Sequence, residues 1–220
     1  MRKRAVFFSG AFLCVTLAAT ASPIIYQVTV NTSSISGTAG SIDFNFNPGS
    51  LGMSQSASVQ VLNFTSDGLL LGGPALTGDV SGGPLPLALT FDNLTGLNDY
   101  FQGFNFGSTL FFDVSLYGPA LSSPDGTSTS GSTFAFSMFS DRAGTVPALT
   151  NNLTDGFAFT VDVNLDGTTT VTNFSDQTTV VPAADAVPEP SSFVLIGIAL
   201  ACCMVLCLWR RQFFAEAGRK

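Results

Sequence analysis

One stretch of the sequence, residues 162–167, has the spacing D-x-N-x-D-G with which calcium-binding loops begin. Calcium takes oxygen ligands, so the candidate metal ligands are Asp162, Asn164 and Asp166. In the helix–loop–helix form of such a site the twelfth position supplies a bidentate Glu, and here that position is Asn173. The flanking residues alternate as in strands, which favours a β-hairpin with a three-residue loop at 166–168. A Ca²⁺ site is the alternative to that hairpin.

A second candidate is the cluster Asn98, Asp99 and Tyr100, which offers an amide, a carboxylate and an amphipathic ring on a predicted loop. Such a group could contact a ligand such as a sugar. The alternative is a turn followed by a Tyr that packs in the core. Sugar-binding surfaces usually expose aromatic rings, and the single Trp lies far away at position 209.

Catalytic chemistry has few residues to use. The chain has no histidine, which excludes His-based general bases, Ser-His-Asp and Cys-His nucleophiles, and His-containing zinc sites. No phosphate-binding G-x-x-x-x-G-K loop occurs, and every acidic residue before Glu189 is Asp. A glycosidase would need two carboxylates about 5–10 Å apart across a cleft. The many Asp residues of a sandwich will include close pairs by chance, but most of them stand at turns. We therefore expect a protein that is not an enzyme.

The elements that must position these residues are strands. Apolar residues alternate with polar ones over many short runs separated by Gly, Pro and Asp-Gly turn signals. This pattern predicts an all-β domain at residues 22–177, an antiparallel two-sheet sandwich that is jelly-roll-like and has a Phe-rich interior. The predicted strands include residues 24–31, 42–46, 57–64, 85–91, 110–116, 134–138 and 157–163.

Two details of this pattern can be checked directly. Phe44 is predicted to point into the core, whereas its neighbour Asp43 is predicted to face water. The apolar phase slips between Val61 and Leu62, which predicts a β-bulge there.

The N-terminus, residues 1–21, reads as a secretory signal peptide. Three basic residues precede an apolar segment, and the cleavage site of signal peptidase is predicted by Ala19 and Ala21. A retained anchor is the alternative. All four cysteines lie in this segment or beyond residue 200, so the exported domain needs no disulfide. Residues 178–187 show no periodicity and are predicted to be a linker.

The charge of the middle of the chain is one-sided. Arg142 is the only basic residue between the N-terminal basic cluster and Arg210, whereas the acidic residues are spread along the whole middle part. Such a surface repels nucleic acid and anionic lipid, and it attracts cations. We therefore expect no nucleic-acid partner.

The C-terminal segment, residues 188–211, combines three features in order. An extended Pro-Glu-Pro peptide leads into an uncharged apolar block at 193–209, and two arginines follow. A helix over the block spans roughly 25 Å, which is short but sufficient for a transmembrane helix, and the positive-inside rule makes 212–220 a cytoplasmic tail. The residues that carry the signal are Val187, Pro188, Glu189, Pro190, Arg210 and Arg211.

This order resembles the PEP-CTERM sorting signal of Gram-negative bacteria. The resemblance implies export, recognition by a membrane exosortase, and a setting of exopolysaccharide and biofilm. It implies an inner-membrane precursor that contacts the membrane transiently and a product in the outer envelope or outside the cell. It also implies that the exosortase cuts near Pro190.

The middle part is similar, through much weaker motifs, to a group of PEP-CTERM ectodomains without an assigned activity. The segments that carry this similarity are residues 26–33, 43–49, 76–82 and 98–104. It implies nothing about catalysis.

Three functions follow as hypotheses. The first is a non-enzymatic protein of the cell surface or the extracellular matrix, which could contact extracellular polysaccharide. The second is a carbohydrate-binding module that uses Ca²⁺. The third is a hydrolase that uses a pair of Asp residues.

Overall fold

A computed structural model of the protein describes residues 22–183. Residues 1–21 and 184–220 are outside the description, and with them the predicted signal peptide, the sorting segment and the apolar block at 193–209. Among the residues described, no helix is both long and apolar enough to cross a membrane.

The described part is built of strands. They are β1 (Ile24–Asn31), β2 (Ala39–Pro48), β3 (Ser58–Ser66), β4 (Leu69–Thr77), β5 (Val80–Gly82), β6 (Leu89–Asp92), β7 (Asp99–Asn105), β8 (Thr109–Tyr117), β9 (Ser132–Phe139), β10 (Phe157–Val163), β11 (Thr169–Asn173) and β12 (Thr178–Pro182). Two short helical turns, η1 (Ser33–Ile35) and α1 (Pro119–Ser122), connect some of them. The prediction of an all-β domain is confirmed for this part of the chain.

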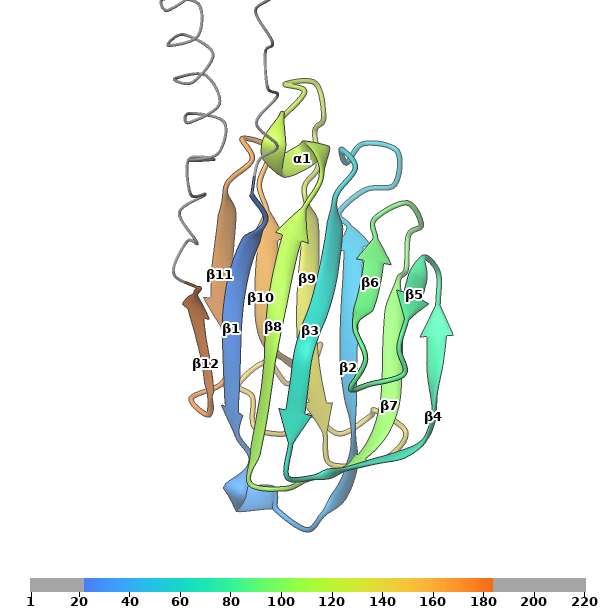
Figure 1. Ribbon diagram of the computed structural model, residues 1–220, viewed down its shortest axis with the longest axis vertical. Helices are drawn as coiled ribbons and strands as arrows, with labels where there is room; N and C mark the ends of the chain where they lie inside the picture. The colour runs from blue at the N-terminus through green and yellow to red at the C-terminus, as the bar shows by residue number, and fades with distance from the viewer. Residues whose placement is uncertain (1–21, 184–220) are drawn as a thin grey trace, which may run out of the picture. The chain divides into compact units, whose positions relative to one another are not determined.

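The strands form two sheets that we call sheet A and sheet B. Sheet A has the order β12-β1-β8-β3-β6-β5, and sheet B has the order β11-β10-β9-β2-β7-β4. All pairings between named strands are antiparallel. Figure 1 shows the sheets face on, with β1, β8 and β3 drawn over the strands of sheet B. Most connections from β1 to β9 cross between the sheets, which is how jelly-roll sandwiches are wound.

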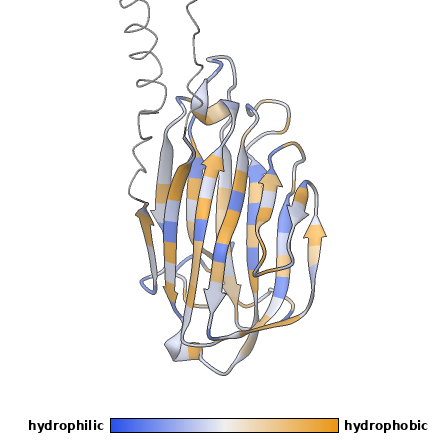
Figure 2. Cartoon of the chain, viewed as in Figure 1, coloured by the Kyte–Doolittle hydropathy of each residue, from blue (hydrophilic) through white to orange (hydrophobic). Residues whose placement is uncertain are grey.

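Period-two alternation places one face of each sheet in the core (Figure 2). In β1, for example, Tyr26, Val28 and Val30 are buried while the residues between them are exposed. In β2 the buried set includes Ile42, Phe44 and Phe46, each fully buried, as the sequence predicts.

Phenylalanine rings join the two sheets. Phe44 of sheet B lies 5.1 Å from Phe112 of sheet A and 4.8 Å from Phe136 of its own sheet, measured between ring centroids. Phe112 and Phe136 are 5.0 Å apart in an edge-to-face arrangement. Such pairs contribute about 0.5–1.5 kcal/mol each beyond the burial of their area, so this cluster helps to hold the two sheets together.

The predicted bulge is confirmed. The register of β3 against β8 shifts between Leu62 and Thr65, and Asn63 has a positive φ of 55°. Asn is one of the few residues that adopt this conformation readily, because its side chain can hydrogen-bond locally. The Asn63 amide donates to Asp113 across the strand.

Two predicted boundaries are wrong. The run at 85–91 is a strand only from Leu89 onward, because Pro84 and Pro86 have no N–H to donate to a ladder. The predicted linker at 178–187 begins with a strand instead, since β12 pairs with β1 along Thr178–Pro182. The sequence of this strand is Thr-Thr-Val-Val-Pro, which has no period-two alternation to recognise.

Candidate functional site

The structure separates the residues of the predicted ligand cluster at 98–100. Asn98 and Tyr100 are both fully buried, and Asp99 alone lies on the outer face of sheet B. The loop prediction is wrong here, because β7 begins at Asp99. Its alternative, a Tyr that packs in the core, describes Tyr100 correctly. These three side chains do not form one surface for a ligand.

Asn98 and Tyr100 instead hold loops in place. The Asn98 amide donates to the carbonyl oxygens of Phe46 and Thr95, both at 2.9 Å, and its oxygen accepts from the Asp79 N–H at 2.8 Å. The Tyr100 hydroxyl accepts from the Leu85 N–H at 3.1 Å and contacts the Gln102 amide oxygen as a donor. Burial raises the pKa of Tyr100, so the hydroxyl remains protonated for this role.

The predicted calcium ligands lie on a hairpin, which is the structure that the sequence favours, with the loop at 165–167 rather than 166–168. β10 and β11 pair from Phe159 to Val163, and the Asn164 N–H donates to the Thr168 carbonyl across the turn. Asp162 accepts from the Thr133 hydroxyl at 2.6 Å, and Asp166 accepts from the Thr168 N–H at 3.0 Å. The Asn164 amide donates to Thr168 and Thr170. Each side chain thus has a structural partner of its own, and Ca²⁺ binding here stays a prediction.

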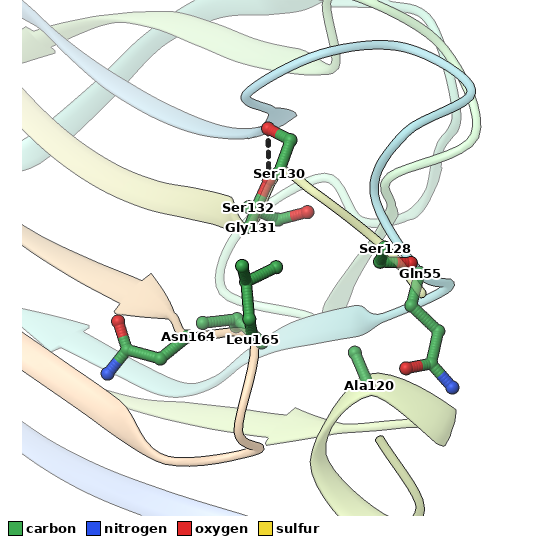
Figure 3. Close-up of a pocket in the computed structure, with 9 residues that line it drawn as sticks. Gln55, Ala120, Ser128, Ser130, Gly131, Ser132, Asn164 and Leu165 are labelled. Atoms are coloured by element: carbon green, nitrogen blue, oxygen red, sulfur yellow. Dashed lines mark hydrogen bonds between the residues drawn. The ribbon is translucent and has the colours of Figure 1, made fainter. Parts of the chain in front are cut away.

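A small hollow lies between this hairpin and α1 (Figure 3). Its volume is about 10 Å³, which is room for about one water molecule. The polar groups on its wall already have partners: Gln55 bonds Ser123 and Asp125, and the Ser132 hydroxyl accepts from Asn93 at 2.8 Å. The hollow is a packed junction and is too small for a sugar.

A larger hollow opens beside β3, β4 and β7. It has a volume of about 380 Å³, and its wall is mainly apolar. Small-molecule pockets of this size usually also carry a few polar groups that orient the ligand. The Ser66 hydroxyl is the main candidate, but it bonds the Thr109 carbonyl and the Gly68 N–H. The hollow therefore offers apolar contact, but its main polar group is already hydrogen-bonded within the protein and is not available to orient a ligand. Its lining residues are Phe64, Thr65, Ser66, Gly68, Leu69, Leu70, Pro86 and Phe104.

Most exposed carboxylates stabilise turns. Asp67 accepts the N–H groups of Ser108 and Thr109 at 2.7 and 2.9 Å, which holds the pKa of that carboxyl below its usual range. Backbone hydrogen bonds lower the pKa of Asp125 in the same way, and bonds from neighbouring backbone and Thr groups do so for Asp141. These carboxylates already accept hydrogen bonds from turn residues, so they are poor candidates for binding a ligand or for acid–base chemistry.

Asp43 is different, and the prediction that it simply faces water is incomplete. It lies on the outer face of sheet B but is half-buried, and one of its oxygens is buried without a hydrogen-bond partner. Burial is the main cause that raises its pKa from 3.8 to about 9, and the nearby Asp99 carboxyl adds to this, while a hydrogen bond with Asn45 opposes it. The sequence has no signal for this pair, because 56 positions separate the two residues and only the register of β2 and β7 brings them together.

Within residues 22–183 no three His, Cys, Asp or Glu side chains converge as a metal cluster would require. The predicted sorting residues and the signal-peptidase site at Ala19 and Ala21 lie outside the described residues.

Comparison with known proteins gives one match. The model of the PEP-CTERM protein-sorting motif matches residues 186–211, which confirms the resemblance drawn from the C-terminal segment. No curated protein and no solved structure matches the chain. The similarity of the middle part to other ectodomains stays a prediction.

Proposed function

We propose, from the premise that this chain carries a PEP-CTERM sorting signal, that it is a non-enzymatic protein of the cell surface or extracellular matrix. The motif indicates a protein that is exported through the membrane and processed by an exosortase. The β-sandwich is then the part that functions outside the membrane, in an exopolysaccharide and biofilm setting.

One observation carries this proposal: all the strands of residues 22–183 end before the sorting motif begins. The last of these strands, β12, ends at Pro182, and the motif starts at residue 186. β12 pairs with β1 from Val30 back to Tyr26, so the end of the described part is tied into sheet A. Cleavage near Pro190 would therefore leave every one of these strands in the product.

The inventory of side chains supports a structural rather than a catalytic role. The chain has no histidine, and residues 22–183 contain neither Cys nor Lys. Most of their carboxylates accept hydrogen bonds that stabilise turns or strands. A core of packed phenylalanines without disulfides gives a rigid module suited to an exposed location.

The proposal is tested by following the C-terminus in a host with an active exosortase. We expect a membrane-bound precursor and a shorter exported product that has lost Arg219 and Lys220, as seen by fractionation and mass spectrometry. Glu189→Ala should leave export intact and block the second cut. Glu216→Ala, a change of the same kind in the predicted tail, is the matched control and should be processed normally. A wild-type product that retains Lys220 would contradict the proposal.

A carbohydrate-binding module is the second candidate. It is favoured by the outer face of sheet B, where Asn45 is opposite Asp99 and the half-buried Phe101 is the next outward residue along β7. A glycan array with and without a chelator separates the two functions. Specific binding would favour this candidate over a purely structural role, and loss of binding on chelation would show that it needs Ca²⁺.

A further inference from the structure

Four polar side chains from three adjacent strands, β7, β2 and β9, lie near one another on the outer face of sheet B. In the pairing of β2 with β7, Asn45 is opposite Asp99, and Asp43 is the next outward residue along β2. In the pairing of β2 with β9, Asp43 is opposite Ser137. Directly opposite residues have Cβ atoms about 4.5–5.5 Å apart, and diagonal neighbours are within reach. We call these residues the Asp43 cluster.

Two oxygen atoms of this cluster have no hydrogen-bond partner. They are Oδ1 of Asp43 and Oγ of Ser137, both buried, and the Ser137 side chain is 0% exposed. Buried polar groups almost always have a partner, and an exception calls for a physical cause. Here the two unpaired oxygens belong to residues that face each other across one strand pair.

The cluster also lacks a positive charge. Asp43 and Asp99 are close enough for their carboxyl groups to interact directly, which costs free energy when both are ionised. Arg142 is the only basic residue in 22–183, and its Nε lies by Gly103, 3.6 Å from where a Cβ on that glycine would be. Gly103 is opposite Ser41, two residues along β2 from Asp43, so Arg142 flanks the cluster without belonging to it.

We propose that the Asp43 cluster binds one Ca²⁺ ion, with ligand oxygens from Asp43, Asp99, Asn45 and Ser137. A divalent cation relieves the repulsion between the carboxylates and gives both unpaired oxygens a partner. Calcium accepts six to eight oxygen ligands in irregular geometry, so water can fill the other positions. Mg²⁺ needs a nearly ideal octahedron and zinc prefers nitrogen and sulfur, so both fit less well.

The affinity is expected to be modest. With only two carboxylates the site resembles the weaker extracellular calcium modules, for which Kd is about 10⁻⁴–10⁻³ M. The described part of the chain brings no three acidic side chains together here, so the protein supplies only two charged ligands.

Isothermal titration of the full chain in detergent with CaCl₂ up to about 5 mM tests the site. We expect one ion per chain and saturation within this range of CaCl₂. Asp99→Asn should weaken binding about tenfold or more, because it removes half of the site's charge. Ser137→Ala should weaken it severalfold and serves as the second variant if Asp99→Asn does not fold.

The matched control is Asp92→Asn. Asp92 lies on the outer face of sheet A, and its partner is the Ser58 hydroxyl rather than a second carboxyl. This variant should bind Ca²⁺ as the wild type does. Absence of binding at about 5 mM would overturn the proposal and leave the carboxyls sharing a proton. Unchanged affinity in Asp99→Asn and Ser137→Ala would place the ion elsewhere and overturn it equally. The inference does not depend on the sorting signal.

Discussion

The two faces of β2 show how differently the two sides of one strand contribute to this protein. The inner face carries Phe44, which packs against rings from both sheets. The outer face carries Asp43, whose environment is set by single side chains on β7 and β9. The inner face is stabilised by the apolar area that it removes from water, and this effect has no preferred direction. The outer face depends on individual polar contacts, which need particular partners in particular positions.

The largest difference between the faces should appear on deleting a ring. Phe44→Ala removes a fully buried side chain and should lower the free energy of unfolding by about 3–5 kcal/mol. Phe101→Ala is the matched control, because Phe101 is on the outer face of the adjacent β7 and is half-buried; we expect about 1 kcal/mol. Urea unfolding of the purified proteins measures both. Equal losses would mean that the core is not where the structure places it.

A polar group on the inner face should give an intermediate effect. Tyr100→Phe keeps the ring but removes the hydroxyl that accepts from the Leu85 N–H. Because the Leu85 N–H then loses its partner in a buried place, the free energy of unfolding should fall by about 1–3 kcal/mol. Tyr26→Phe is the comparison, since the Tyr26 hydroxyl bonds Thr169 at the edge of the core. Chemical denaturation should show a smaller loss for Tyr26→Phe, and the reverse order would contradict this assignment.

Asp43 on the outer face should make the free energy of unfolding depend on pH. Asp43 has a pKa of about 9 in the folded protein against 3.8 ordinarily, so between these values the folded state holds a proton that the unfolded chain has released. Stability therefore falls as pH rises through this range. With chelator present, we expect a loss of about 1–2 kcal/mol between about pH 5 and pH 8, reduced from the full linkage value because the group is partly exposed.

Two variants separate this effect from the general titration of an acidic protein. Asp43→Asn should remove most of the pH dependence, whereas Asp162→Asn should retain it. The titratable group that faces Asp43 is Asp99 from β7, while β9 contributes the uncharged Ser137. Urea unfolding over a pH series gives the measurement, and a wild-type curve as flat as that of Asp43→Asn would contradict the raised pKa.

How much the sequence could predict differs between the same two faces. The residues of the inner face can be predicted from alternation within each strand. Phe44 and Phe46, for example, are two positions apart in β2, and their orientation does not depend on which strand lies beside β2. The bulge near Asn63 follows from the same period, since it breaks there. The sorting motif is also local, because Pro188, Glu189 and Pro190 act through their order in one segment.

The outer face could not be read in this way. Whether Asp43 is a solvated side chain or half of a carboxyl pair depends on β7 being its neighbour and on the register that brings Asp99 beside Asn45. The same holds for β12, which becomes a strand because β1 offers it a free edge. Local periodicity is determined by the sequence alone, because each residue's phase depends on its near neighbours. Pairing between distant strands is decided only when the sheets assemble, and the polar chemistry of this protein depends on that pairing.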